Sequence, residues 1–166
     1  TQVLEYAKNC YYVERGSVIK INEHKILFLG GAVSTDGDSR VLYPKSWKRI
    51  RKRMGAYAPG AAWLNEAPNK QDGENAFKQI QKHSPEIWIT HDIRRKISPY
   101  DRGGLINPLS GLKTDDTANM LEGLFQVADH KPQWWFHGHY HRHYHETIDD
   151  TNYVGCGIAH QHHRPA

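Results

Sequence analysis

Short apolar runs alternate with amphipathic segments along this sequence. The runs Val18–Ile21 and Lys25–Ala32 flank Asn22–His24 and predict a β-hairpin. Ile26–Leu29 is continuously apolar, which is typical of a strand buried on both faces. Later strands are predicted at Glu86–Thr90, Gln133–His137, Tyr144–Ile148 and Tyr153–Cys156, the last two pairing across the turn Asp149–Asn152.

Two amphipathic segments between these strands predict helices. Asn69–Lys82 places Phe77 and Ile80 among polar residues and ends at Ser84-Pro85. A second helix is predicted from the N-cap region Thr114–Asp116 to Val127. Because strands and helices alternate, the sequence predicts an α/β fold. The stretches 33–68 and 93–112 lack periodicity and carry glycine and proline, so we expect loop and short helix in the first and a long loop in the second.

Length and composition narrow the class of protein. With 166 residues, 38% hydrophobic and 24% charged, the chain predicts one domain, residues 1–166, that is neither disordered nor embedded in a membrane. Its two cysteines, Cys10 and Cys156, do not form a CxxC motif. A secreted disulfide scaffold and a cysteine-based zinc site are therefore disfavoured, and a reducing, cytoplasmic location is expected.

Three predicted strands end in glycine or histidine. In each case an apolar strand has glycine or histidine at its C-terminal end, and the segments are Leu27–Gly31, Ile87–His91 and Trp135–His139. The carboxyl ends of parallel strands meet at one edge of a sheet, which is where α/β proteins place their functional side chains. If these three strands are parallel neighbours, their terminal residues converge.

Histidine is the residue in excess, with twelve in the chain. Gly138-His139-Tyr140-His141 offers two imidazoles separated by one residue, and neutral imidazole is the commonest protein ligand for borderline divalent metals. His91 offers a third, although a histidine after a buried strand is more often a hydrogen-bonded core residue. Two places are open to His137, His143 and His145, the mouth of a site around this motif and exposed strand faces, and the second is the favoured prediction. Trp88, Trp134 and Trp135 are expected in the core.

The net charge of +4 includes a basic stretch from Lys45 to Arg53. A solvated helix face or loop is the usual explanation for such a run. The alternative is a groove for a nucleic-acid backbone, supported by the interleaved Trp47 and nearby Tyr57. The basic residues available for such contacts are Lys45, Lys48, Arg49, Arg51, Lys52 and Arg53.

Four motifs taken in order resemble the C-terminal half of the calcineurin-like metallophosphoesterases. They are Gly30–Asp36 with Arg40, then Trp63–Glu66, Thr90–Asp92 and Phe136–His141. The resemblance implies a β-sandwich core flanked by helices and a binuclear centre of divalent ions such as Mn, Fe or Zn. It also implies that His91 and His139 bind one ion and that His141 binds the other.

The resemblance assigns further positions near the metals. Arg40 would contact a phosphate of the substrate, or would instead fix the glycine loop through a salt bridge to Asp36. The family's N-terminal motifs, D-x-H, G-D-x-x-D and G-N-H-[DE], are absent. The chain starts at Thr1, about where a family member would have passed the last of them. The remaining ligands and the histidine that protonates the leaving group are therefore expected upstream of Thr1 or on another chain.

The leading hypothesis is a metal-dependent phosphoesterase that hydrolyses phosphomonoesters or phosphodiesters. A degenerate relative that binds nucleic acid or a protein through Lys45–Arg53 is the alternative, and salt-sensitive binding without metal dependence would distinguish it. A third hypothesis is a small histidine-rich metal-binding module, in which His160, His162 and His163 would matter more than His91. For these three, a solvated tail is the simpler interpretation.

Overall fold

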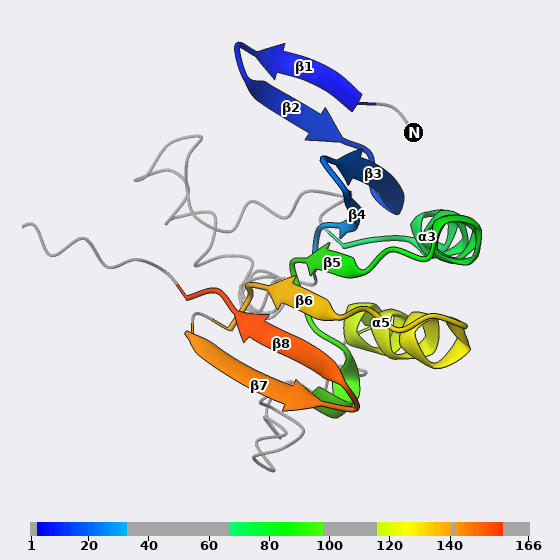
Figure 1. Cartoon of the computed structure of the whole chain (residues 1–166), viewed down its shortest axis with the longest axis vertical. Helices are drawn as coiled ribbons and strands as arrows, with labels where there is room; N and C mark the ends of the chain where they lie inside the picture. Colours follow the sequence, from blue (N-terminus) through cyan, green and yellow to red (C-terminus); the bar gives the residue numbers. More distant parts are fainter. Residues whose placement is uncertain (1–2, 33–66, 98–115, 141, 158–166) are drawn as a thin grey trace, which may run out of the picture.

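The structure is a computed structural model that describes residues 3–32, 67–97, 116–140 and 142–157 (Figure 1). A two-stranded hairpin, β1 (Val3–Ala7) and β2 (Cys10–Val13), precedes a six-stranded sheet in the order β3-β4-β5-β6-β8-β7. The sheet strands are β3 (Ser17–Ile21), β4 (His24–Leu29), β5 (Ile87–Thr90), β6 (Trp134–His137), β7 (Tyr144–Ile148) and β8 (Thr151–Gly155). The helices are α3 (Lys70–His83), the short 3-10 helix η2 (Arg95–Ile97) and α5 (Asp116–Val127).

The fold is mixed α/β, as the alternation of strands and helices predicts. β4, β5, β6 and β8 run parallel, whereas β3 and β7 pair antiparallel at the two edges of the sheet. The predicted hairpin around Asn22–His24 is confirmed, and so are both helices. The three strands that end in glycine or histidine are parallel neighbours, so their carboxyl ends share one edge.

Two details of the strands differ from the prediction. The β1–β2 hairpin was not predicted, and most of its residues are exposed, so it lacks the buried alternation that marks a strand in sequence. β8 begins at Thr151, earlier than expected. Asp149 and Asp150 alone form the turn from β7, with φ of 50° and 61°, and two consecutive positive φ angles suit the twist of a tight hairpin.

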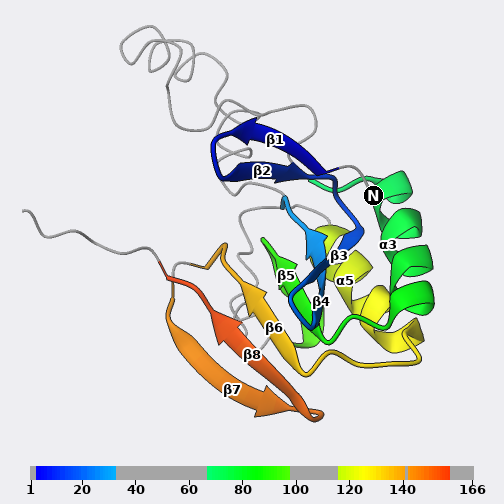
Figure 2. The ribbon, with the colours of Figure 1, turned by 45° about the horizontal axis from the view of Figure 1, so that its top comes forward.

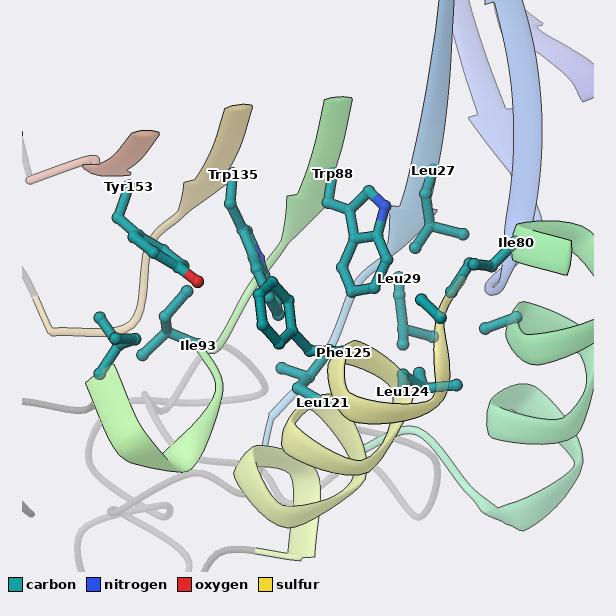
Figure 3. Packing of buried hydrophobic residues seen from close by; sticks show 13 residues of the cluster. Leu27, Leu29, Ile80, Trp88, Ile93, Leu121, Leu124, Phe125, Trp135 and Tyr153 are labelled. Carbon is teal, nitrogen blue, oxygen red and sulfur yellow. The ribbon is translucent and has the colours of Figure 1, made fainter. Parts of the chain in front are cut away.

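One face of the sheet carries the hydrophobic core. Leu27, Trp88, Trp135 and Tyr153 lie opposite one another on four adjacent strands and are fully buried (Figure 3). The rings of Trp88 and Trp135 lie 4.8 Å apart in an edge-to-face arrangement. Helices α3 and α5 lie together over this face (Figure 2) and bury their apolar side chains against it. Burial of each large side chain stabilises the fold by about 2 kcal/mol.

The opposite face of the sheet is also apolar, but it is half-exposed among the described residues. Ile26, Ile87 and Trp134 form one row across three strands, and Phe28, Ile89 and Phe136 form the next. The expectation that Ile26–Leu29 is buried on both faces is therefore met only on the helix side. The prediction of a core position for Trp134 is wrong, because Trp135 takes the inward position and Trp134 remains 37% exposed.

Local sequence signals explain the limits of α3. The Asn69 side chain accepts a hydrogen bond from the Asp72 amide, and the Asp72 carboxylate accepts one from the Asn69 amide, which is a capping box. Ser84 adopts a left-handed conformation that ends the helix, and Pro85 follows. None of the helices in the described ranges is long and apolar enough to cross a membrane.

Gly16 allows α3 to approach the sheet closely, which yields a test of the packing. Its φ is 74°, and a Cβ there would lie 2.7 Å from the Asp72 carbonyl oxygen and 2.8 Å from the Ala76 amide nitrogen. Gly16→Ala should lower the free energy of unfolding by at least about 2 kcal/mol, because the side chain adds both backbone strain and overlap with a helix backbone.

Gly30→Ala is the matched control for this substitution. Gly30 is exposed and a Cβ there meets no atom within 4 Å, so its unfolding free energy should change by no more than about 0.5 kcal/mol. Urea denaturation of both variants measures the two changes, and equal stabilities would contradict the close packing of Gly16 on α3.

Candidate metal site at the ends of the parallel strands

Two of the predicted metal ligands lie side by side at the carboxyl edge of the sheet. His91 follows β5 and His139 lies two residues beyond β6, with ring centroids 5.2 Å apart and the ring planes at 68°. The Gly138 amide donates a hydrogen bond of 3.0 Å to the His91 carbonyl oxygen, which ties the two strand ends together. His91 is exposed, so the alternative of a buried core histidine is wrong for this residue.

The turn after β5 is fixed from inside the core. The indole nitrogen of the buried Trp135 donates a 2.8 Å hydrogen bond to the Thr90 hydroxyl, and that hydroxyl donates to the Asp92 carbonyl oxygen. Since Thr90 and Trp135 sit on neighbouring strands, packing of the core determines where the chain turns. His91 lies between Thr90 and Asp92, the two residues that these hydrogen bonds hold.

Asp92 connects the two histidine segments through its side chain. The residue is fully buried, and its Oδ1 accepts hydrogen bonds of 2.7 Å from both the Ile93 amide and the Tyr140 hydroxyl. The other oxygen, Oδ2, is buried without a hydrogen-bond partner among the described residues. The carboxylate therefore links the segment after β5 to the segment after β6.

Arg94 holds the same segment from its other side. It is 2% exposed, lies 3.9 Å over the Phe125 ring, and forms ion pairs of 2.8 Å with Asp149 and 3.5 Å with Glu122. The hydrogen bond from Arg94 holds the pKa of the Asp149 carboxyl below its usual value. These two carboxylates and the aromatic face anchor the chain beyond His91 to α5 and to the β7–β8 turn, although the Arg94 Nε is buried without a hydrogen-bond partner among the described residues.

His137 is buried, contrary to the expectation of an exposed strand face. It is only 2% exposed because it lies two residues from Trp135 and therefore faces the core. Its Nδ1 lies 3.1 Å from the Gly138 carbonyl oxygen and its Nε2 pairs with the Tyr144 hydroxyl. A carbonyl only accepts, so Nδ1 carries the proton and Nε2 accepts from Tyr144, which is a neutral imidazole.

The surroundings of His137 also oppose its protonation. Burial lowers the pKa of His137 to about 4, and the neighbouring His139 and His91 contribute in the same direction. The ring is therefore uncharged at neutral pH and is a structural group at the buried end of β6, next to the segments that carry His91 and His139.

The pair His91 and His139 fits part of a metal site. Two imidazoles at this separation match the donor preference of Mn, Fe and Zn. Within the described ranges no group of three or more His, Cys, Asp or Glu side chains forms a complete site. The donor chemistry thus agrees with a divalent ion, and further donors are needed to complete its coordination.

Several predicted functional residues lie outside the described residues. These are His141, Arg40, Asp36, the basic residues of Lys45–Arg53, and His160, His162 and His163. His143 and His145 are exposed, as expected, and His145 stacks on Trp134 at 5.6 Å. The hydrogen bonds and ion pairs of Tyr140, Tyr144 and Arg94 were not predicted. The partners of Tyr140 and Arg94 are distant in the sequence, and His137, the partner of Tyr144, was expected on the exposed face.

No protein-family model matches this chain, and no curated protein matches it.

The burial of His137 predicts a pH dependence of stability. The folded state binds this proton only near pH 4, whereas the unfolded state binds it near pH 6.5. The unfolded state therefore gains protons first as the pH falls, so the free energy of unfolding should fall between pH 6.5 and about pH 4, by on the order of 3 kcal/mol. Denaturation series in the presence of a chelator measure this loss.

His137→Gln provides the comparison, because it removes the titrating ring and should flatten the pH dependence in that window. A nuclear magnetic resonance titration of the ring gives the pKa directly. A midpoint near 6.5 for His137 would contradict its burial.

Proposed function

We propose that this protein is a metal-dependent phosphoesterase that hydrolyses phosphomonoester or phosphodiester bonds with a binuclear metal centre. The observation that carries this proposal is the juxtaposition of His91 and His139 at the carboxyl ends of adjacent parallel strands. These are the two histidines that the resemblance to calcineurin-like metallophosphoesterases assigns to one ion. They come from motifs separated by more than forty residues, so chance proximity along the chain does not explain the pair.

His91 and His139 would hold the first ion and His141 would contribute to the second. A pair of divalent ions supplies an activated water and neutralises charge on the phosphoryl oxygens during in-line attack on phosphorus. The chain itself fixes the backbone that carries the imidazoles, because the hydrogen bonds of Thr90 and Asp92 hold the residues on both sides of His91 and attach Tyr140, the residue after His139. Arg40 would bind a phosphate oxygen of the substrate.

The resemblance implies that the donor set is completed from elsewhere. The remaining ligands, and the histidine that protonates the leaving group, would come from a second chain or another segment, as the resemblance implies. Such an arrangement makes metal affinity depend on the presence of that partner, because a site with too few donors binds weakly.

The finer fold assignment, a β-sandwich flanked by helices, belongs to the same proposal. Its support is the half-exposed apolar face of the sheet, where Ile89, Trp134 and Phe136 gather. Parallel strands are normally covered on both faces. A second sheet packed here would bury these side chains and complete the two-layer core.

A reducing, cytoplasmic setting is consistent with the chain's chemistry. Cys10 and Cys156 are both exposed and are not joined in a disulfide. Exposed thiols persist in a compartment that keeps cysteine reduced.

Hydrolysis of the model substrates p-nitrophenyl phosphate and bis(p-nitrophenyl) phosphate with added Mn²⁺ tests the proposal, using protein isolated from its native source so that any second chain or segment that completes the site is present. A chelator should abolish the activity. His139→Ala should lower kcat/KM by more than about 100-fold, since losing a direct ligand costs more than losing an outer-shell partner. His130→Ala is the matched control, because His130 is exposed in the α5–β6 connection, and it should leave kcat/KM unchanged.

A different result would contradict the phosphoesterase proposal. Absence of hydrolysis together with salt-sensitive, metal-independent binding of an oligonucleotide would overturn the proposal. It would favour instead a catalytically degenerate protein that binds nucleic acid through Lys45–Arg53.

A further inference from the structure

We propose that Asp92 and Tyr140 are positioning residues that hold His139 beside His91. This inference rests on the proposed function, because it concerns the ligand pair of the candidate metal site. Neither residue is a metal ligand in the proposed function. Their role is to fix the backbone on both sides of a histidine before any ion arrives.

His139 occupies a conformation that its own chemistry disfavours. Its φ is 65°, and the Tyr140 amide donates a 2.8 Å hydrogen bond back to the Gly138 carbonyl oxygen, so His139 is the centre of a three-residue γ-turn. A γ-turn with positive φ is rare and strained for a residue with a side chain. Such a conformation persists only where the surroundings determine it.

Two hydrogen bonds bracket this turn and attach it to the segment after β5. On the near side, the Gly138 amide donates to the His91 carbonyl oxygen at 3.0 Å. On the far side, the Tyr140 hydroxyl donates to Asp92 Oδ1 at 2.7 Å. Since His91 and Asp92 are adjacent, both attachments reach the same short segment, and His139 is held between them.

Asp92 is a rigid anchor for the far attachment. It is fully buried, its Oδ1 also accepts from the Ile93 amide, and its carbonyl oxygen accepts from Thr90. The Tyr140 ring additionally contacts the His139 ring edge-to-face, with centroids 4.9 Å apart. Loss of the hydroxyl alone should therefore release the turn without removing the packing of the ring.

The first test needs no metal. In the metal-free protein, ring protons of His91 and His139 should show a nuclear Overhauser contact, because the ring centroids lie 5.2 Å apart. Tyr140→Phe and Asp92→Ala should weaken or abolish that contact. Asp92→Asn keeps an oxygen acceptor and should retain it. Tyr6→Phe, at an exposed tyrosine of β1, is the control for loss of a hydroxyl.

The second test measures Zn²⁺ affinity by calorimetry on the same proteins. Tyr140→Phe and Asp92→Ala should weaken binding by about 10- to 100-fold, as expected for partners that orient a ligand. Tyr6→Phe should bind as the wild type does, and Asp92→Asn should restore most of the affinity.

The two tests separate failure of this inference from failure of the proposed function. An unchanged His91–His139 contact in Tyr140→Phe and Asp92→Ala, with unchanged Zn²⁺ affinity, would overturn the positioning role. A contact that is lost in the variants while the wild type binds no Zn²⁺ even weakly, with the ion in large excess, would support the positioning role and overturn the metal site.

Discussion

The parallel pairing of β5 with β6 is the constraint on which the candidate site depends. In this register Trp88 lies opposite Trp135 and Thr90 lies opposite His137. Both strands therefore end at the same level, and the next residues of each leave the sheet together. A shift of one residue would exchange the faces of every side chain on β6 and bring His137 out of the core. The burial of two tryptophans on one face makes such a shift costly.

Core and site are connected by hydrogen bonds as well as by register. The Trp135 indole, buried among apolar side chains, reaches Thr90, and Thr90 in turn fixes the backbone at Asp92. Arg94 extends the support to α5 and to the β7–β8 turn through Glu122 and Asp149. The exposed His91 and the half-buried His139 thus lie on a packed base, which is the arrangement that gives a metal ligand a defined orientation before the metal binds.

The sequence predicted the elements well because their signals are local. Alternating apolar residues, the capping residues of α3 and the short turn at Asn22–His24 each act within a few positions. The same alternation places His137 on the buried face of the sheet, because Trp135 and His137 are two residues apart on one strand. The prediction of an exposed His137 is wrong because the two-residue period that places Trp135 inward places His137 inward as well.

Other features of the site have no signal within a single segment. The hydrogen bond from Tyr140 to Asp92 joins residues 48 positions apart, and the buried Arg94 draws its partners from two different elements. The strained turn at His139 depends on those long-range contacts, so no local sequence pattern predicts it. The β1–β2 hairpin lacks a buried face, which removes the periodicity that identifies strands.

The central claim is that His91 and His139 share one metal ion, and a paramagnetic titration tests it most directly. Mn²⁺ added in substoichiometric amounts broadens the resonances of the groups nearest to it. We expect the ring signals of His91 and His139 to broaden together and before those of His24, His83, His130 and His145. Broadening that begins at His160, His162 and His163 and leaves His91 sharp would contradict the claim and place metal binding in the C-terminal histidines.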